Sequence, residues 1–540
     1  MIELPNGWES VKLESLYNFV IGGDWGKAPD YEDSEFVDVL CIRGTEFRSW
    51  YKEKGKSAVP RKVKKTSLEK RQLKLGDILV EISGGGPDQP VGRTVLIDRQ
   101  AIVNAKGIPL VCTNFTRLTR PSTKIESSYL NYYLTHFYNS GEITKYQSGS
   151  NNLRNLQFKD YIQIEIPLAP LNEQKRIVEK LDEVLAQVDT IKARLDGIPA
   201  LLKRFRQSVL ASAVSGKLTE EWRAGHEKID MFEVCNELSK VRQDKYSLAC
   251  KSAKLQKLKK PRRPSNIDEK IEPHLDALKL IPCFPEEWGK NVLAFITDNY
   301  ADSIVDGPFG ASINVKTDYI EAGVPVIRMV NIRPFKFISE NRKFILEEKF
   351  SDLERHRIDS GDVLLAKVGA TTGDCCIYPK GQPVAMLSTT GSCRITVDKQ
   401  IYKAEFLTIV LNSYRSVFNS ITSQVAQPFL NMKTIKAIPI PIPQVGEQRE
   451  IVRLVDQYFA FADTIDAQVK KAQARVDKLT QSILAKAFRG ELVPQDPNDE
   501  PADKLLERIA AARKEAEALA KAAKKAAPKK RTTKAKTTTV

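Results

Sequence analysis

The chain has 540 residues, of which 42% are hydrophobic and 28% are charged. This length exceeds what one hydrophobic core supports, and the composition is typical of folded rather than disordered protein, so two or three domains are expected. Lysine and arginine outnumber aspartate and glutamate by 84 to 68, which gives a formal net charge of +16. Lysine-rich segments contribute part of that excess, but the balance still favours a polyanionic partner such as nucleic acid.

The cysteines and the N-terminal sequence indicate the compartment. The eight cysteines include no CxxC pair and no regular framework, which favours a reduced interior without disulfides. The first residues, MIELPNGWES, have neither the basic nor the apolar region of a secretory signal, and no run of about 18 apolar residues follows. We therefore expect a cytoplasmic protein with no membrane segment.

An internal repeat organises the whole chain, at a displacement of about 275 to 285 residues. Similar anchors occur in the same order in both halves, and between the early anchors the halves differ almost completely. The paired anchors are Trp8 with Trp288, Ile42-Arg43 with Ile327-Arg328, Gly76-Asp77 with Gly361-Asp362, Ile166-Pro167 with Ile440-Pro441, Glu173-Gln174 with Glu447-Gln448, Gln207-Ser208 with Gln481-Ser482, and Gly216 with Gly490. Each half thus has a divergent part followed by a similar part.

The divergent parts, residues 1–168 and 281–442, are predicted to be two α+β globules. Short β-rich runs such as GDILVEI and GDVLLAKV alternate with Gly, Pro and Asn turns. SSYLNYYLTHFYN and AEFLTIVLNSYRSVF have the apolar spacing of helices.

The first similar part, residues 169–220, is predicted to be a long heptad helix that ends near Gly216. Its apolar residues alternate by four and three, as the a and d positions of a coiled coil do. Gly197-Ile198-Pro199 interrupts this pattern and predicts a kink or a short break, with packing on both sides. The predicted seam consists of Ile177, Leu181, Val184, Val188, Ile191, Leu195, Ile198, Leu202, Phe205 and Val209.

The second similar part, residues 443–492, repeats the heptad and has no internal proline. A helix of about 40 residues extends about 60 Å, which is long enough for a spacer. An ordinary amphipathic bundle helix is the alternative interpretation of either run. The second seam consists of Ile451, Val455, Tyr458, Ala462, Ile465, Val469, Ala472, Val476, Leu479 and Ile483.

Two basic segments lie outside these four parts. Residues 221–280 are lysine-rich and contain KKPRRPSN, which predicts a connector that is partly helical and then extended. Residues 493–540 begin with the Ala, Glu and Lys content of a helix and are predicted to end as a disordered basic tail.

Motifs for catalysis and for cofactor or metal binding are absent from the sequence. It contains no GxxxxGK[ST] loop, no GxGxxG after a strand, and no Asn or Asp followed by Pro-Pro-aromatic of the kind that amino-methyltransferases use. None of the four histidines has a partner at metal-ligand spacing. We therefore predict no catalytic residue, no metal and no cofactor for this chain.

Two segments identify a family resemblance. EQKRIV at 173–178 and EQREIV at 447–452 each follow a Pro-rich strand and precede a heptad helix. With these segments the chain resembles the specificity subunits of Type I restriction-modification enzymes, over nearly its whole length. The two helical segments are similar to those of the enteric K-type (type IA) branch.

The resemblance implies an architecture and a set of partners. The two globules would be target recognition domains in pseudo-twofold tandem repeat, and the two long helices would form an antiparallel coiled coil. Each domain would read one half of a split, asymmetric double-stranded DNA target, while the helices would fix the gap and dock two methyltransferase subunits. Two translocase-nuclease subunits would complete the complex. S-adenosylmethionine, ATP and Mg²⁺ would belong to the partner subunits.

Candidate DNA-contacting residues come from two loops in each globule. Base readout in a major groove uses Arg or Lys for guanine and Asn or Gln for adenine, whereas many other polar contacts reach only phosphate. One set follows an early strand and the other precedes the last strand. The candidates are Arg43, Arg48, Lys145, Gln147, Asn151, Asn152 and Arg154 in the first half, and Arg328, Asn331, Arg333, Gln424, Gln427, Asn431 and Lys433 in the second.

Two other functions compete with this interpretation. A coiled-coil structural protein that binds DNA without reading it would share the charge and the helices, and would bind all sequences equally. A self-contained DNA methyltransferase or nuclease would need a cofactor loop and a catalytic motif, which the sequence lacks. The DNA target itself does not follow from the residue types.

Overall fold

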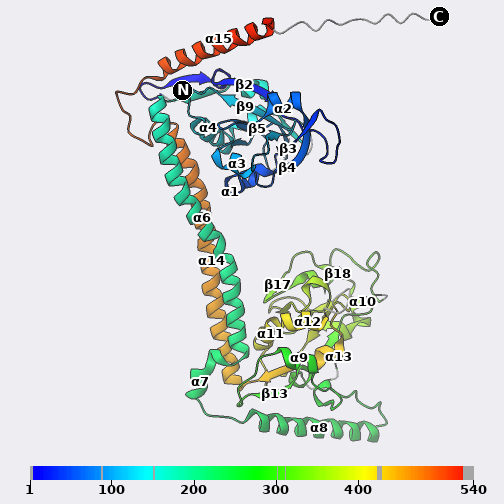
Figure 1. Cartoon of the computed structure of the whole chain (residues 1–540). Coiled ribbons are helices and arrows are strands. Elements are labelled where there is room, and N and C mark those ends of the chain that lie inside the picture. Colours follow the sequence, from blue (N-terminus) through cyan, green and yellow to red (C-terminus); the bar gives the residue numbers. More distant parts are fainter. Residues whose placement is uncertain are drawn as a thin grey trace, which may run out of the picture. The chain divides into compact units, whose positions relative to one another are not determined.

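A computed structural model describes residues 4–86, 89–149, 153–298, 300, 302–310, 312–422 and 429–526. The chain forms two compact units, one of residues 1–196 with 470–540 and one of residues 197–469. Each unit contains one α+β domain together with part of each long helix (Figure 1). The predicted fold class and the repeat are confirmed.

The first domain is built on two small sheets. One has the strand order β2-β9-β5-β7, and the other has the order β4-β3-β8, in which β3 and β8 are parallel. A further sheet has the order β10-β11-β6, and β1 pairs with β12. The strands are β1 (Glu9–Lys12), β2 (Tyr17–Gly22), β3 (Phe36–Ile42), β4 (Val59–Lys64), β5 (Ile78–Glu81), β6 (Ser83–Gly85), β7 (Thr94–Leu96), β8 (Leu110–Cys112), β9 (Thr116–Pro121), β10 (Gln147–Ser148), β11 (Arg154–Leu156) and β12 (Glu165–Leu168). The helices are α1 (Trp50–Glu53), α2 (Lys65–Arg71), α3 (Arg99–Asn104), α4 (Ser127–Asn139) and α5 (Phe158–Tyr161).

The second domain repeats this plan. Its sheets have the orders β14-β23-β20-β21 and β18-β15-β22-β19, again with one parallel pair, β15 and β22, and β13 pairs with β24. The strands are β13 (Gly289–Val292), β14 (Ile304–Asp306), β15 (Val324–Ile327), β16 (Ile332–Arg333), β17 (Lys336–Phe337), β18 (Lys343–Ile345), β19 (Arg357–Ile358), β20 (Val363–Ala366), β21 (Cys375–Ile377), β22 (Ala385–Leu387), β23 (Ser392–Ile395) and β24 (Pro439–Ile442). The helices are α9 (Leu275–Leu280), α10 (Glu347–Asp352), α11 (Ala404–Ser413), α12 (Arg415–Thr422) and α13 (Met432–Lys436).

Two long helices follow the last strand of each domain. They are α6 (Leu171–Val214) and α14 (Val445–Ala487), and α6 includes Pro199 within its helical span. The predicted short break is therefore wrong: the helix tolerates this proline. Within the first unit Lys192 Nζ lies 2.8 Å from Asp477 Oδ1, and Gln473 donates to Asp196, so the two helices run antiparallel there.

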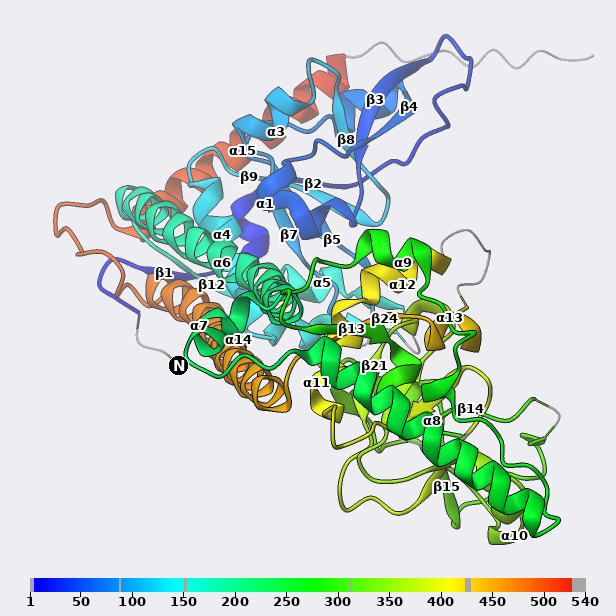
Figure 2. The same cartoon turned by 90° about the horizontal axis from the view of Figure 1, so that it is seen from below.

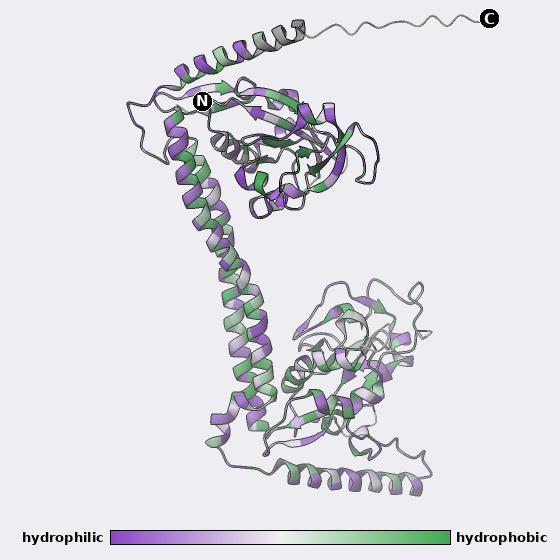
Figure 3. Ribbon diagram, viewed as in Figure 1, coloured by the Kyte–Doolittle hydropathy of each residue, from purple (hydrophilic) through white to green (hydrophobic). Residues whose placement is uncertain are grey.

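The helical stretches in the second unit are also antiparallel. Arg206 pairs with Asp463 at 2.6 Å, and the rings of Phe205 and Tyr458 meet edge to face. Apolar and polar residues alternate along both helices (Figure 3). Most predicted seam residues are buried or half-buried, which confirms the coiled coil, but Ile191, Tyr458 and Leu479 are exposed by 46%, 38% and 49%.

A tryptophan–glutamate hydrogen bond attaches each domain to a long helix. Trp8 Nε1 donates to Glu173 at 3.0 Å, and Trp288 Nε1 donates to Glu447 at 2.8 Å. The glutamine that follows each glutamate is fully buried and donates to a backbone carbonyl at the start of its helix. The tryptophan at the start of each domain and the glutamate after its last strand are therefore in contact. This shared contact explains why both residues recur in the two halves of the sequence.

The connector and the tail each contain a helix where the sequence predicts one, and each helix packs against a domain, which the sequence did not predict. Helix α8 (Met231–Leu255) packs through Met231 and Cys235 into the core of the second domain (Figure 2). Helix α15 (Ala502–Ala526) packs through Ala502, Leu505 and Ile509 into the core of the first. The basic residues at 527–540 lie outside the described residues.

Gly216 closes the first long helix in a conformation that other residues rarely adopt. Its φ is +75°, and a Cβ at this position would overlap the ring of Pro285. We expect Gly216→Ala to lower the free energy of unfolding by about 1–3 kcal/mol, because it combines backbone strain with a steric clash. Gly197, a helical glycine with open space around its Cβ position, is the matched control, and Gly197→Ala should be neutral or stabilising by about 1 kcal/mol. Urea unfolding of the two variants measures the difference; equal effects would contradict the strain.

Candidate nucleic-acid interface

Loops from several strands converge at one end of the sheets in the first domain. After β2, Gly23 N donates to Thr116 O at 3.2 Å, and after β8, Thr113 N donates to Ile42 O at 3.0 Å. After β5, the carbonyl of Ile82 accepts from Leu156 N. The early candidate loop and the late candidate loop therefore lie at the same end. We call this end, with residues 22–27, 43–48, 82–86, 89, 113–116, 147–149 and 153–155, the loop edge of the first domain.

The second domain has the same loop edge. Gly307 N donates to Ser392 O at 3.2 Å, Ser388 N donates to Ile327 O at 2.9 Å, and Leu430 N donates to Lys367 O at 2.9 Å. Residues 306–310, 328–333, 367–371, 388–392 and 429–431 form this edge. The same three backbone connections thus join the loops in both domains, although the loop sequences differ.

An ion pair stiffens the loop edge of the first domain. Glu81, at the end of β5, is buried, and Arg93 donates to both of its carboxylate oxygens. Arg93 Nη2 also donates to Gly44 O at 3.0 Å. This pair joins the loop after β3 to the loop after β5. Arg93 was not among the predicted residues because it precedes β7, outside the two candidate loops.

The candidate residues at the first loop edge differ in their exposure and in the hydrogen bonds and ion pairs that they make within the domain. Arg43 is held by the buried Glu46, whereas Arg48 is exposed and donates to Gln89. Lys145 is exposed and paired with Glu142. Gln147 donates to the carbonyl of Val91 at 3.4 Å. Asn151 and Asn152 lie outside the described residues.

Arg154 is the best placed of the candidate arginines. Its backbone pairs with Gly85 across the β11–β6 ladder, which places the residue at the loop edge. Its Nε is buried and has no hydrogen-bond partner among the described residues. A guanidinium that is positioned but not saturated by its own domain retains donors for a ligand.

The candidates at the second loop edge include one misassignment. Asn331 is fully buried, and its amide donates to Ile338 O and Glu340 O. This side chain supports the loop and is not available to a base. Arg328 donates to Asn341 O, and Arg333 donates to the carbonyls of Met329 and Ile332.

The remaining candidates of this domain lie near its last helix. Asn431 caps α13 by accepting from Thr434 N, and Lys433 is exposed on the same helix. Gln424 and Gln427 lie outside the described residues. Lys367, which follows β20, is fully buried. Its Nζ lies 3.3 Å from Asp306 Oδ2 and 5.2 Å from the ring centroid of Phe429.

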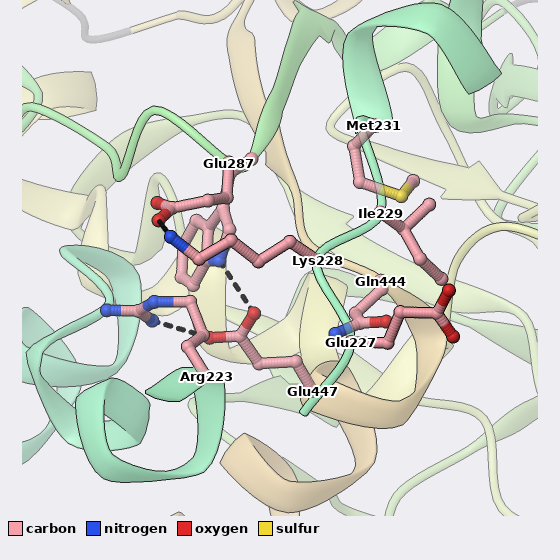
Figure 4. Close-up of a pocket in the computed structure, with 9 residues that line it drawn as sticks. Arg223, Glu227, Lys228, Ile229, Met231, Glu287, Gln444 and Glu447 are labelled. Atoms are coloured by element: carbon pink, nitrogen blue, oxygen red, sulfur yellow. Dashed lines mark hydrogen bonds and ion pairs between the residues drawn. The ribbon is translucent and has the colours of Figure 1, made fainter. Parts of the chain in front are cut away.

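The anchor of the second domain also lines a small pocket. Glu447 accepts from Trp288, Thr219 and Arg223, and Arg223 Nη1 lies 2.5 Å from Glu447 Oε1 (Figure 4). In the first domain Glu173 accepts a side-chain hydrogen bond only from Trp8 among the described residues. Its Oε1 is buried there without a hydrogen-bond partner, and burial raises the pKa of this carboxyl. The pocket is a packing feature of the anchor.

The described part of the chain offers neither a metal site nor a membrane-spanning helix. No three His, Cys, Asp or Glu side chains there come together as metal ligands. The cysteines are free thiols. None of the helices described has the length and apolar content needed to cross a membrane.

Comparisons with known proteins decide the family. The sequence model described as the Type I restriction modification DNA specificity domain matches residues 5–200 and 311–473. The chain belongs to this family. It is a DNA specificity subunit of the Type I restriction-modification kind, and as such it is not itself an enzyme.

Two relatives agree with this assignment. The EcoKI specificity subunit of Escherichia coli K12 is 29% identical over 98% of this chain and 99% of its own length. The EcoBI specificity subunit of Escherichia coli is 36% identical over 68% of this chain and 67% of its own length. Both confirm the predicted resemblance to the enteric K-type branch, and neither alternative function is favoured.

The fold agrees too. A chain from a solved type I restriction-modification system, described for its complex assembly and conformational transition, matches with a TM-score of 0.54 and 16% identity, covering 91% of this chain and 99% of that chain.

Arg154 provides a direct test of base readout. We expect Arg154→Ala to relax one position of one half-site and to weaken binding there by about 1–3 kcal/mol, because a bidentate arginine contact discriminates between bases. Methylation sequencing in cells that also contain the cognate methyltransferase subunit would measure the change. Lys124→Ala is the control and should leave the motif intact, because Lys124 is exposed and follows the end of β9 opposite the loop edge. Equal weakening on all sequences would contradict a base-reading role.

Proposed function

We propose that the two loop edges each read one half of a split, asymmetric DNA target. The observation that carries this proposal is the pairing of a shared scaffold with different loops: both domains join their loops through the same backbone connections, while the side chains they present differ. Such a design lets one fold address two different half-sites. The formal charge of +16 adds the sequence-independent attraction for phosphate that such a reader needs.

The long helices would set the gap between the half-sites and dock two methyltransferase subunits. Apolar side chains that remain exposed on these helices support the docking: Ile191, Leu201, Tyr458, Phe461 and Leu479. Isolated exposed apolar residues are common, but five on one helix pair would offer partner helices apolar contacts.

The chain would act in the cytoplasm within a larger complex. Two methyltransferase subunits would use S-adenosylmethionine, and two translocase-nuclease subunits would use ATP and Mg²⁺. This chain would recognise the DNA sequence, and its partners would catalyse the reactions.

Single-molecule methylation sequencing of DNA from cells that express this chain with its cognate methyltransferase subunit tests the proposal. The expected result is a split, asymmetric motif with one methyl-adenine in each half. An active and assembled complex that produces no motif would overturn it in favour of sequence-indifferent DNA binding.

A further inference from the structure

The two domains share one loop feature that the sequence comparison above does not contain. Gly23-Asp24-Trp25-Gly26 follows β2, and Gly307-Pro308-Phe309-Gly310 follows β14. Both have the pattern Gly-x-aromatic-Gly, and both lie at the loop edge. We call them the aromatic turns.

The first glycine of each turn is fixed in the same way. A Cβ on Gly23 would overlap the carbonyl oxygen of Thr113, and a Cβ on Gly307 would overlap that of Thr389. Each glycine N–H also donates to the first residue of the neighbouring strand, at 3.2 Å in both domains. The close backbone approach requires glycine and holds the start of the turn in a fixed place, so the aromatic residue two positions later projects from a fixed base.

The aromatic rings are exposed. Phe309 is 79% exposed and Trp25 is 36% exposed, and neither belongs to the hydrophobic cores of the described residues. In the second domain Phe429, also at the loop edge, is 46% exposed. Large apolar rings gathered at the edge where polar candidate readers converge indicate a binding surface rather than packing.

The surroundings of the rings identify the occupant as DNA. The guanidinium of Arg61 lies 4.2 Å from the ring centroid of Trp25 and donates to Trp25 O. Lys367 lies behind the ring of Phe429, but it is fully buried and paired with Asp306, so Arg61 is the cation that a ligand could reach. Cations next to exposed aromatic rings suit a ligand that offers phosphate and an apolar sugar or base surface side by side.

The aromatic turn occurs in both domains, which distinguishes a sequence-independent contact from a sequence-specific one. Residues that read different half-sites must differ between the two domains, whereas the aromatic turn is common to both. We infer that Trp25 and Phe309 are sequence-independent DNA contacts, in which each ring packs against the sugar and base surface of the duplex and adds affinity for target and non-target DNA alike. This inference rests on the proposed function.

The test uses Phe309→Ala in the assembled complex with the methyltransferase subunit. Fluorescence anisotropy is measured with a duplex that carries the motif and with a scrambled duplex. We expect affinity for both duplexes to fall by the same factor, roughly three- to tenfold, while methylation sequencing returns the wild-type motif. Phe309→Trp should restore affinity because it keeps an aromatic face.

Leu346→Ala is the matched control. Leu346 is 59% exposed and follows β18, whose Ile345 pairs with Val324 at the end of β15 opposite the loop edge. It should leave both affinities unchanged.

Three results would overturn the inference. Relaxation of one base position would make Phe309 a base reader. Loss of the methyltransferase subunit on purification, with unchanged DNA affinity in the complexes that remain, would make the turn a protein contact. Unchanged affinity for both duplexes would leave the turn with no binding role. A failure of the proposed function is distinguishable, because the wild-type complex would then yield no motif while its affinity for the scrambled duplex could still respond to Phe309→Ala.

Discussion

Replacing Glu447 by glutamine is expected to lower the free energy of unfolding of the second domain by about 2–4 kcal/mol. The same change at Glu173 should alter the free energy of unfolding of the first domain by about 1 kcal/mol or less. Both glutamates are buried and both accept from a tryptophan. Only Glu447 also holds Arg223, whose side chain is 16% exposed. Neutralising Glu447 leaves that guanidinium largely desolvated without a counter-charge, and the remaining solvation of Arg223 places the cost at the lower end for buried ion pairs.

The repeat explains the difference between the two anchors. At the constant displacement of the helices, Thr219 corresponds to Val493 and Arg223 to Pro497, so the first domain has lost both donors that satisfy the second oxygen of Glu447. Hydrogen exchange of peptides from each domain, in the full-length chain, would measure the two stabilities separately. Equal destabilisation by the two substitutions would contradict this account.

The pH dependence of the first anchor has a definite sign. Burial raises the pKa of Glu173, so the folded chain binds this proton more tightly than the unfolded chain does. This carboxyl therefore favours the folded state at low pH, and the contribution is lost as the pH rises through the raised pKa. Glutamine does not titrate, so the Glu173→Gln variant does not lose this contribution as the pH rises. The free energies of unfolding of wild type and variant should therefore become equal on acidification and differ towards neutral pH.

Deleting residues 501–540 is expected to destabilise the first domain by about 4 kcal/mol or more, because it removes the buried side chains of Leu505 and Ile509 from the core. The backbone bond from Ala502 N to Gly7 O, at 2.8 Å, would be lost as well. Deleting residues 527–540 alone is the control and should leave stability unchanged. Urea unfolding of both truncated chains measures the effect. An equal midpoint for both would show that α15 adds nothing to the fold.

The point variant Leu505→Asp separates packing from chain length. It should reproduce most of the loss caused by the longer deletion, because it places a charge in an apolar core. The second domain, whose core does not include α15, should keep its hydrogen-exchange protection in both variants.

The sequence predicts the long helices well because their signal is regular and local. Ten seam positions in each helix keep one spacing, and the helices begin at Leu171 and Val445, close to the predicted boundaries at 169 and 443. The domain pattern is predicted from the paired anchors for a similar reason: Trp8 with Glu173 and Trp288 with Glu447 are direct contacts, so their types and positions are coupled.

The roles of α8 and α15 could not be predicted because few residues carry them. At a displacement of 271 residues Met231 corresponds to Ala502, Val234 to Leu505 and Leu238 to Ile509, so the two helices are copies of one element. Three packed positions of unlike size, of which Val234 and Leu238 are only partly buried, do not stand out from a solvated helix. What decides their role is the domain surface against which they pack.

The sequence offers the two candidate loops of each domain by residue type and does not place them relative to each other. Backbone hydrogen bonds among distant strands bring both loops to one edge. Asn331 was assigned by residue type, and the structure turns its amide inward to bind Ile338 O and Glu340 O. Polar side chains serve turns and ligands equally well, so type alone cannot separate the two uses.

The order in which the chain is synthesised has a consequence for how it folds. The second unit is continuous from residue 197 to 469, whereas the first needs residues 1–196 together with 470–540. Domains generally fold in the order in which they leave the ribosome. Here the N-terminal domain emerges first but lacks the partner stretch of α14 and the apolar face of α15. Part of its core therefore stays uncovered until α15 has been synthesised. The C-terminal domain, made later, has all its parts and reaches its final structure first. A ribosome that stalls in the last 70 or so codons would release a chain with one finished domain and one that holdase chaperones would have to protect.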